Sequence, residues 1–200
     1  MKPIAVVGFG LRFPDAPTPG SFWQVIRDAR DTSRPVPDGR WTLPAQMALA
    51  GAEPRFDRVR SERGCFIETP EGPIGDLDEL LLQSLDPSVQ LAVIAGVEAA
   101  GSVAKDLDPD RTRVILGQLL LPTDSTSATA ESIIGDTIEE LVLETIGRED
   151  RRPRGTPSCH PLDRHDASLP AAALQRALRL RGGASTLDAA CASSLYSIAI

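Results

Sequence analysis

The 200-residue chain is predicted to adopt an α/β fold with a central, mostly parallel sheet and flanking helices. Short apolar runs, bounded by glycine and proline, alternate along the chain with stretches whose apolar residues recur at helical spacing. The hydrophobic fraction of 42% suffices for a buried core. No internal repeat or low-complexity tract interrupts this alternation.

Three segments are predicted to be strands of the central sheet. Residues 4–7, "IAVV", form a continuous apolar run that ends at Gly8. Residues 113–119 form a second apolar run, and residues 184–190 lead directly into Cys191. Strands covered on both faces have such unbroken apolar stretches, so these segments are the expected strands of the sheet.

Two of the predicted helices carry clear end signals. Ser21 is expected to begin one, because Gln24 three residues later completes a capping box. Asp86 is expected to cap another that closes at Gly101, with Pro87 in its first turn. Further helices are predicted over residues 133–146, 171–180 and from residue 193 onward.

Residues 31–75 are rich in proline, glycine and arginine and lack periodicity. They are predicted to form a long irregular segment, with a short strand near residues 65–67. Connections of this length in a compact domain are usually functional or pack against a partner. Trp23 and Trp41 are expected to pack in the core or between lobes.

Charge and hydropathy exclude several classes of function. Lys and Arg number 21 against 28 Asp and Glu, a formal charge of −7. Such a balance disfavours nucleic acid as a partner. No apolar run approaches the roughly 20 residues of a membrane span, and the N-terminus lacks the apolar region of a secretory signal. We therefore expect a cytoplasmic protein that is not embedded in a membrane.

The three cysteines, Cys65, Cys159 and Cys191, are odd in number and widely spaced, which predicts free thiols rather than a disulfide framework. Cys191 stands out because it lies between a predicted strand and a predicted helix, among alanines and serines. Small neighbours permit a sharp turn and the approach of a substrate carbonyl. The positive end of a helix dipole favours the thiolate, and the backbone amide of Cys191 can donate to an oxyanion. The alternative is a small buried hydrophobic residue.

Two other patterns point to different chemistry. "GFGLRF" follows a predicted strand as a dinucleotide-binding loop would, but Phe13 replaces the third glycine and prolines occupy the place of the helix. A structural turn is the favoured interpretation. Cys159, His160 and His165 lack the paired spacing of a zinc site, so we expect no metal. Asp188 is expected to hold the turn before Cys191 by bonding backbone amides.

"DAACASSL", residues 188–195, resembles the nucleophile motif of β-ketoacyl synthases, the condensing domains of type I polyketide and fatty-acid synthases, which commonly read Asp-Thr-Ala-Cys-Ser-Ser-Ser-Leu. Residues 4–41 are similar to the opening strand, Arg-Phe-Pro loop, Phe-Trp helix and Pro-x-x-Arg-Trp tail of that family. Residues 85–101 resemble its Asp-Pro helix, and residues 111–117 its Arg-Thr-x-Val strand. The matches occur in family order along nearly the whole chain.

The resemblance implies a thiolase-like fold of which residues 1–200 are the N-terminal half. It implies that Cys191 accepts an acyl chain from the phosphopantetheine of an acyl carrier protein, with no other cofactor. A carbanion from malonyl-carrier protein then attacks in a decarboxylative Claisen condensation. A homodimer is expected. The family's two catalytic histidines, its lysine and a second oxyanion-hole amide belong to the other half, so the chain alone is expected to be inactive and poorly soluble.

Departures from the family pattern leave the subtype open. Ala189 and Ala192 replace the commoner threonine and serine, as in condensing domains of polyunsaturated fatty-acid and enediyne-type synthases. Gln90 stands where arginine is common. One alternative function is a non-elongating homologue that transfers or gates acyl chains or serves as a structural partner. A nucleotide-binding oxidoreductase is a more distant one.

Overall fold

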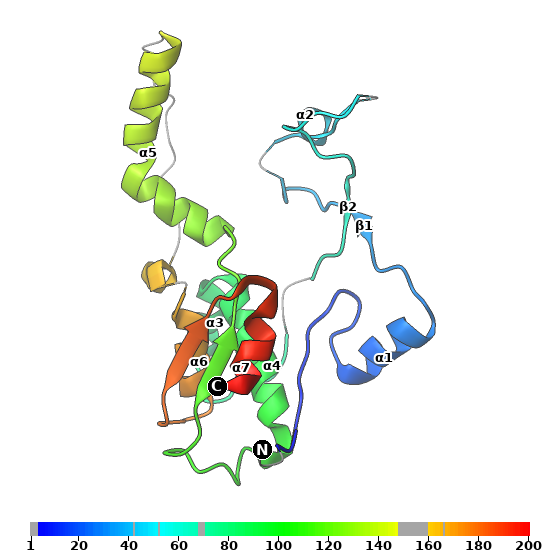
Figure 1. Ribbon diagram of the computed structural model, residues 1–200, viewed down its shortest axis with the longest axis vertical. Helices are drawn as coiled ribbons and strands as arrows, with labels where there is room; N and C mark the ends of the chain where they lie inside the picture. The colour runs from blue at the N-terminus through cyan, green and yellow to red at the C-terminus, as the bar shows by residue number, and fades with distance from the viewer. Residues whose placement is uncertain (1–3, 42, 52, 68–70, 148–159, 166) are drawn as a thin grey trace. The chain divides into compact units, whose positions relative to one another are not determined.

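The computed structural model describes residues 4–41, 43–51, 53–67, 71–147, 160–165 and 167–200 (Figure 1). The chain divides into two compact units, residues 11–70 and residues 1–10 with 71–200. The larger unit contains α3 (Glu79–Ser84), α4 (Pro87–Ala100), η1 (Gly101–Val103), β3 (Val114–Gly117), α5 (Asp124–Ile146), η2 (Pro161–His165), α6 (Leu169–Ala177), β4 (Ala184–Leu187), η3 (Ala190–Ala192) and α7 (Ser193–Ala199).

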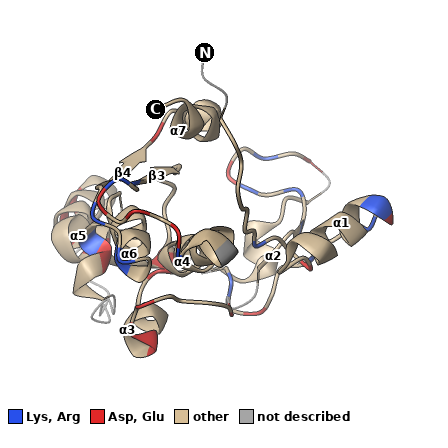
Figure 2. Cartoon of the chain, turned by 90° about the horizontal axis from the view of Figure 1, so that it is seen from below, with Lys and Arg blue, Asp and Glu red and all other residues tan. Residues whose placement is uncertain are grey.

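The sheet of the larger unit is a parallel pair. β3 and β4 are in register from Val114 opposite Ala184 to Gly117 opposite Leu187. Helix α6 precedes β4 in the chain and packs against both strands, and α7 packs against them as well (Figure 2). The predicted α/β arrangement is confirmed in this parallel pair and its helices. β3 is shorter at both ends than predicted, and β4 ends three residues early.

The predicted strand at residues 4–7 is wrong. These residues have no regular secondary structure, do not pair with β3 or β4, and leave Val6 85% exposed. The segment instead runs against α4. A Cβ at Gly8 would lie 2.0 Å from the carbonyl oxygen of Ala99, and one at Gly10 would lie 2.1 Å from that of Ala95. This close backbone contact explains why both positions are glycine. The segment therefore packs against a helix instead of pairing with a strand.

Helix α4 is the centre of the core, and its predicted ends are confirmed. The Asp86 side chain accepts a hydrogen bond from the Ser88 amide at 2.8 Å, and the backbone turns at Gly101, which has a positive φ. Gly96 permits α6 to come close, since a Cβ there would lie 2.3 Å from Leu174. Two adjoining clusters form the core: Leu82, Leu85, Val89, Val93, Ala173 and Ala177; and Val114, Ala171, Leu174 and Leu180.

Helix α5 begins earlier than predicted. Thr123 is its N-cap and forms a capping box with Thr126, so the helix starts at Asp124 rather than near Ile133. Its predicted end is confirmed, because Gly147 has the left-handed conformation that closes helices. Most of its apolar side chains are exposed, including Ile134, Ile138 and Leu141.

The smaller unit contains α1 (Pro19–Arg27), β1 (Arg34–Pro35), α2 (Ala45–Ala48) and β2 (Arg63–Gly64). The expected cap at Ser21 is wrong: Thr18 is the N-cap, and Ser21 is the third helical residue that bonds back to it. Pro19 fits the first turn, which moves the start two residues earlier. β1 and β2 pair antiparallel, two residues before the short strand predicted near residues 65–67. The rest of the expected irregular segment is largely irregular.

Among the residues that the structure describes, no helix is both long enough and apolar enough to span a lipid bilayer.

Candidate active site at Cys191

Cys191 lies on a tight turn that follows the carboxyl end of β4. The strand ends at Leu187 because Asp188 bends the backbone: its Oδ1 accepts a hydrogen bond from the Ala190 amide at 2.9 Å. Its Oδ2 accepts one from the Leu120 amide at 3.4 Å, just beyond β3. The expectation that Asp188 holds the turn through backbone amides is confirmed. Its carboxylate also ties the turn to the neighbouring strand.

The residue before the cysteine has an unusual backbone. Ala190 has φ +49°, in the left-handed region that alanine seldom occupies. Such a conformation costs roughly 1–2 kcal/mol in a residue with a Cβ, so neighbouring interactions have to hold it. The turn directs the chain from β4 into η3, where Cys191 is the central residue.

The Cys191 side chain is exposed. Within the described residues, neither its thiol nor its amide makes a hydrogen bond to the protein. The predicted helix start at Ser193 is confirmed, but Cys191 lies two residues earlier, in the 3-10 turn. The cysteine is therefore accessible from solvent, and its amide has no hydrogen-bond acceptor within the described part of the protein.

The turn rests on β3 through Ser193, which is buried although Cys191 is not. Gly117 makes this contact possible, since a Cβ there would lie 2.7 Å from both the carbonyl carbon and the carbonyl oxygen of Ser193. Sequence reasoning missed both residues. The signal available was a glycine inside a predicted strand, which often marks a close backbone approach.

The other candidate residues are not brought to this turn. Cys65 lies in the smaller unit and accepts a long hydrogen bond from the Thr32 hydroxyl, with 3.7 Å between oxygen and sulfur. His160 and His165 lie at or beside η2, which contacts α5 and α6 and not η3. Cys159 lies outside the described residues.

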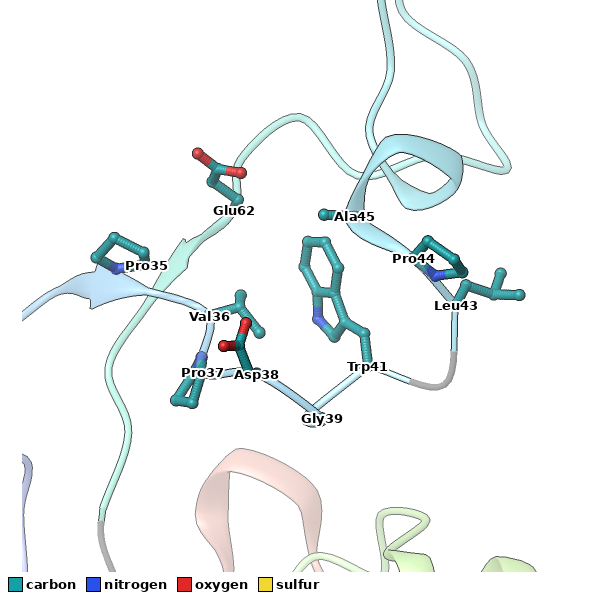
Figure 3. A pocket seen from close by; sticks show the side chains of 10 residues that line it. All are labelled: Pro35, Val36, Pro37, Asp38, Gly39, Trp41, Leu43, Pro44, Ala45 and Glu62. Atoms are coloured by element: carbon teal, nitrogen blue, oxygen red, sulfur yellow. The ribbon is translucent and has the colours of Figure 1, made fainter.

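A separate pocket of about 450 Å³ lies within the smaller unit (Figure 3). The Trp41 indole stands in it beside Ala45, and the carboxylates of Asp38 and Glu62 lie on the opposite wall. Trp41 thus lines a pocket instead of a closed core. Trp23 is 63% exposed, so it does not lie in a core, and the other expectation, packing between lobes, stays a prediction. Both tryptophans belong to the smaller unit, whereas the Cys191 turn belongs to the larger one.

Comparison with known proteins identifies relatives along the whole chain. Residues 1–200 match the family model described as "Beta-ketoacyl synthase, N-terminal domain". A phenolphthiocerol/phthiocerol polyketide synthase of Mycobacterium tuberculosis (strain CDC 1551 / Oshkosh) is 30% identical over 205 residues, which cover 98% of this chain and 10% of the relative. The chain thus spans about a tenth of that protein.

Two solved structures share the fold. The PfaC keto synthase–chain length factor superimposes with a TM-score of 0.76 at 26% identity, covering 97% of this chain and 22% of that one. The ketosynthase from module 6 of the bacillaene synthase of Bacillus subtilis 168 superimposes with a TM-score of 0.60 at 20% identity, covering 98% and 28%. The part of the chain that the structure describes therefore shares the thiolase-like fold of these ketosynthases.

Proposed function

The chain belongs to the β-ketoacyl synthase family, and from this premise we propose that Cys191 is the acyl-accepting nucleophile of a decarboxylative Claisen condensation. One observation carries the proposal. The cysteine in the family-like motif is exposed, with its own amide beside it, on a strained turn at the carboxyl end of a parallel strand. Ligands bind at this end of the strands in open α/β sheets.

The first half-reaction is a thioester exchange. The Cys191 thiolate attacks the carbonyl carbon of an acyl group carried on the phosphopantetheine arm of an acyl carrier protein. The Cys191 amide donates to the oxyanion that forms. The carbon–sulfur bond to the arm then breaks, and the arm leaves as a thiolate that takes up a proton. The acyl chain remains as a thioester on Cys191, and a covalent intermediate of this kind divides one difficult step into two.

The second half-reaction forms the carbon–carbon bond. Malonyl-carrier protein loses CO2, and the electron pair left on its α-carbon attacks the acyl carbonyl on Cys191. The Cys191 thiolate leaves, and the elongated β-ketoacyl chain stays on the carrier. The proton-handling histidines and the second oxyanion donor are proposed to come from another part of the complete domain, because η2, which contains His165 and directly follows His160, does not contact η3.

The proposed partners follow from this chemistry. An acyl carrier protein delivers both substrates, and no dissociable cofactor takes part. A second copy of the complete domain is proposed to form a homodimer, and the proposed location is the cytoplasm.

The test is condensation by a complete condensing domain that contains these residues. Cys191→Ala is expected to abolish β-ketoacyl product, whereas Cys65→Ala, which also removes an exposed thiol, is expected to retain it. Product formation by Cys191→Ala would show that Cys191 is not the nucleophile. Acylation of the wild type without any condensation would favour the alternative of a non-elongating acyl-transfer homologue.

A further inference from the structure

We propose that Ser193 is a positioning residue for Cys191: its hydroxyl locks the turn that presents the thiol and the amide to the acyl group. The inference rests on the proposed function and deepens it. It concerns a side chain that does not touch the substrate but fixes the backbone of a residue that does.

The Ser193 hydroxyl is bonded to the two residues that precede Cys191. Its Oγ accepts a hydrogen bond from the Ala189 amide at 2.9 Å and donates one to the Ala190 carbonyl oxygen at 2.8 Å. A serine that caps a helix bonds forward, to amides in the first turn. Ser193 is already the first residue of α7, and its side chain bonds backward, so its interactions stabilise the turn and not the helix end.

Ser193 stabilises the strained backbone of Ala190. Ala190 has φ +49°, and without support an alanine would relax to a negative φ. Both of its polar backbone groups are tied: Asp188 accepts from its amide at 2.9 Å, and Ser193 donates to its carbonyl. With both ends of Ala190 fixed, the direction in which the next residue, Cys191, leaves the turn is fixed as well.

Ser193 is buried and hydrogen-bonded, whereas the Cys191 side chain is exposed and makes no hydrogen bond within the described residues. Ser193 is 6% exposed, and Gly117 on β3 lies directly against its backbone. Cys191 is exposed and makes no side-chain hydrogen bond within the described residues. No hydrogen bond of its own therefore orients the thiol. Its position comes from the turn behind it, and that turn is anchored to the sheet through Ser193 and Asp188.

The experiment measures acylation of Cys191 by an acyl-pantetheine thioester in a complete condensing domain. Ser193→Ala removes both hydrogen bonds, and the rate constant of acylation is expected to fall about ten-fold, because small misplacements of a reacting atom are costly. The KM for the thioester is expected to change little, since Ser193 is buried away from it. The matched control, Ser194→Ala, alters an exposed neighbour whose side chain makes no such bond and is expected to stay within about two-fold of wild type.

A second pair of variants separates positioning from general packing. Ala190→Gly added to Ser193→Ala is expected to recover much of the acylation rate, because glycine adopts a positive φ without strain. Ala190→Val, with Ser193 intact, is expected to lose as much as Ser193→Ala, since a β-branched residue resists this φ. Position 190 is exposed, so Ala190→Val decides the matter even when Ser193→Ala does not fold.

Two results would overturn the inference: acylation of Ser193→Ala or Ala190→Val at the wild-type rate, or no recovery on adding Ala190→Gly to a folded Ser193→Ala protein. Cys191→Ala serves as the reference for the function itself. Continued acylation at the motif in Cys191→Ala would refute the proposed nucleophile, while an inert Cys191→Ala beside a fully active Ser193→Ala would refute only the role of the serine.

Discussion

At the scale of single residues, Cys191 differs from Cys65 in its backbone and not in its exposure. Both thiols are exposed. Cys65 follows a two-residue strand in the smaller unit, where the Thr32 hydroxyl donates to its sulfur. Cys191 follows a strained, doubly tied turn and has a free amide beside it. The reactivity expected of Cys191 therefore comes from the turn that precedes it and from its unbonded amide.

The two thiols can be compared directly. In a folded, complete domain near neutral pH, iodoacetamide is expected to alkylate Cys191 faster than Cys65. Peptide mass spectrometry after short exposure measures both rates in one sample, with an acyl-thioester substrate as competitor. Protection of Cys191 alone by the substrate supports the assignment, and faster labelling of Cys65 counts against it.

Gly117 provides a test of the anchor beneath the turn. Gly117→Ala is expected to cost about 1–3 kcal/mol of unfolding free energy, because its Cβ would overlap the Ser193 backbone. It is also expected to slow acylation of Cys191, since the strand and the turn have to separate. Thermal unfolding and acylation rates of the same protein measure the two effects.

The control for this change is Gly51→Ala, where an added Cβ meets nothing within 4 Å. It is expected to leave both quantities close to wild type. Equal stability of Gly117→Ala and Gly51→Ala would show that β3 does not approach Ser193 as closely as described.

At the scale of elements, helix ends were predictable where a capping side chain and a glycine or proline occur together. Asp86, Pro87 and Gly101 fix both ends of α4 as predicted. The N-cap predicted at Ser21 was wrong because Thr18, three residues earlier, forms a capping box as well and is followed by Pro19 in the first turn. Local chemistry alone does not choose between two such caps.

Strands were less predictable than helices, because a strand depends on a partner elsewhere in the chain. Residues 4–7 have the composition of a buried strand, but Gly8 and Gly10 bring the segment against α4. The Cys191 turn was predictable in part: Asp188 has a side chain that bonds nearby amides, and the motif predicts that Cys191 is the nucleophile. The backward bonds of Ser193 and the positive φ of Ala190 have no sequence signal, since serine and alanine suit many conformations.

The cap of α4 gives a prediction that depends on pH. Burial raises the pKa of Asp86, but the polar groups of Thr123, Ser88 and Ser125 lower it by more, so its pKa lies below its usual value. Oδ1 accepts a hydrogen bond from the Ser88 amide, whereas Oδ2 has no hydrogen-bond partner among the described residues. A carboxyl with a lowered pKa stabilises the fold above its unfolded pKa, and that stability is lost as the pH falls through the folded value.

Asp86→Ala is therefore expected to reduce the unfolding free energy by about 1 kcal/mol at pH 7, as loss of a helix cap does. Asp86→Asn keeps a capping oxygen but not the charge, and its deficit relative to wild type is expected to shrink as the pH falls below about 4. Denaturant titrations at pH 7 and pH 3 measure both. A deficit for Asp86→Asn that grows on acidification would contradict the sign of the pKa shift.

At the scale of the whole molecule, the chain leaves much apolar surface uncovered. Ile134, Ile138 and Leu141 lie on one face of α5, and all three are exposed. Helix α7 carries no charged residue, and its Leu195 and Ile198 are exposed too (Figure 2). Large exposed apolar patches mark surfaces that another part of an assembly covers.

The 200-residue chain expressed alone is therefore expected to self-associate. Ile138→Lys combined with Leu141→Lys is expected to lower its apparent mass in sedimentation velocity, because two charges interrupt the α5 face. Thr137→Lys, one residue from Ile138 and also exposed, adds charge without removing an apolar side chain and serves as the control. If Thr137→Lys lowers the apparent mass as much as the double variant does, the change is due to net charge and not to the apolar face.

The most direct test of the central claim is to locate the acyl group after a complete condensing domain is incubated with an acyl-carrier thioester and no malonyl substrate. Peptide mass spectrometry is expected to find the acyl mass on the peptide that contains Cys191, and to find none in Cys191→Ala. An acyl group on the peptide of Cys65 or Cys159, or an equally acylated Cys191→Ala protein, would contradict the account.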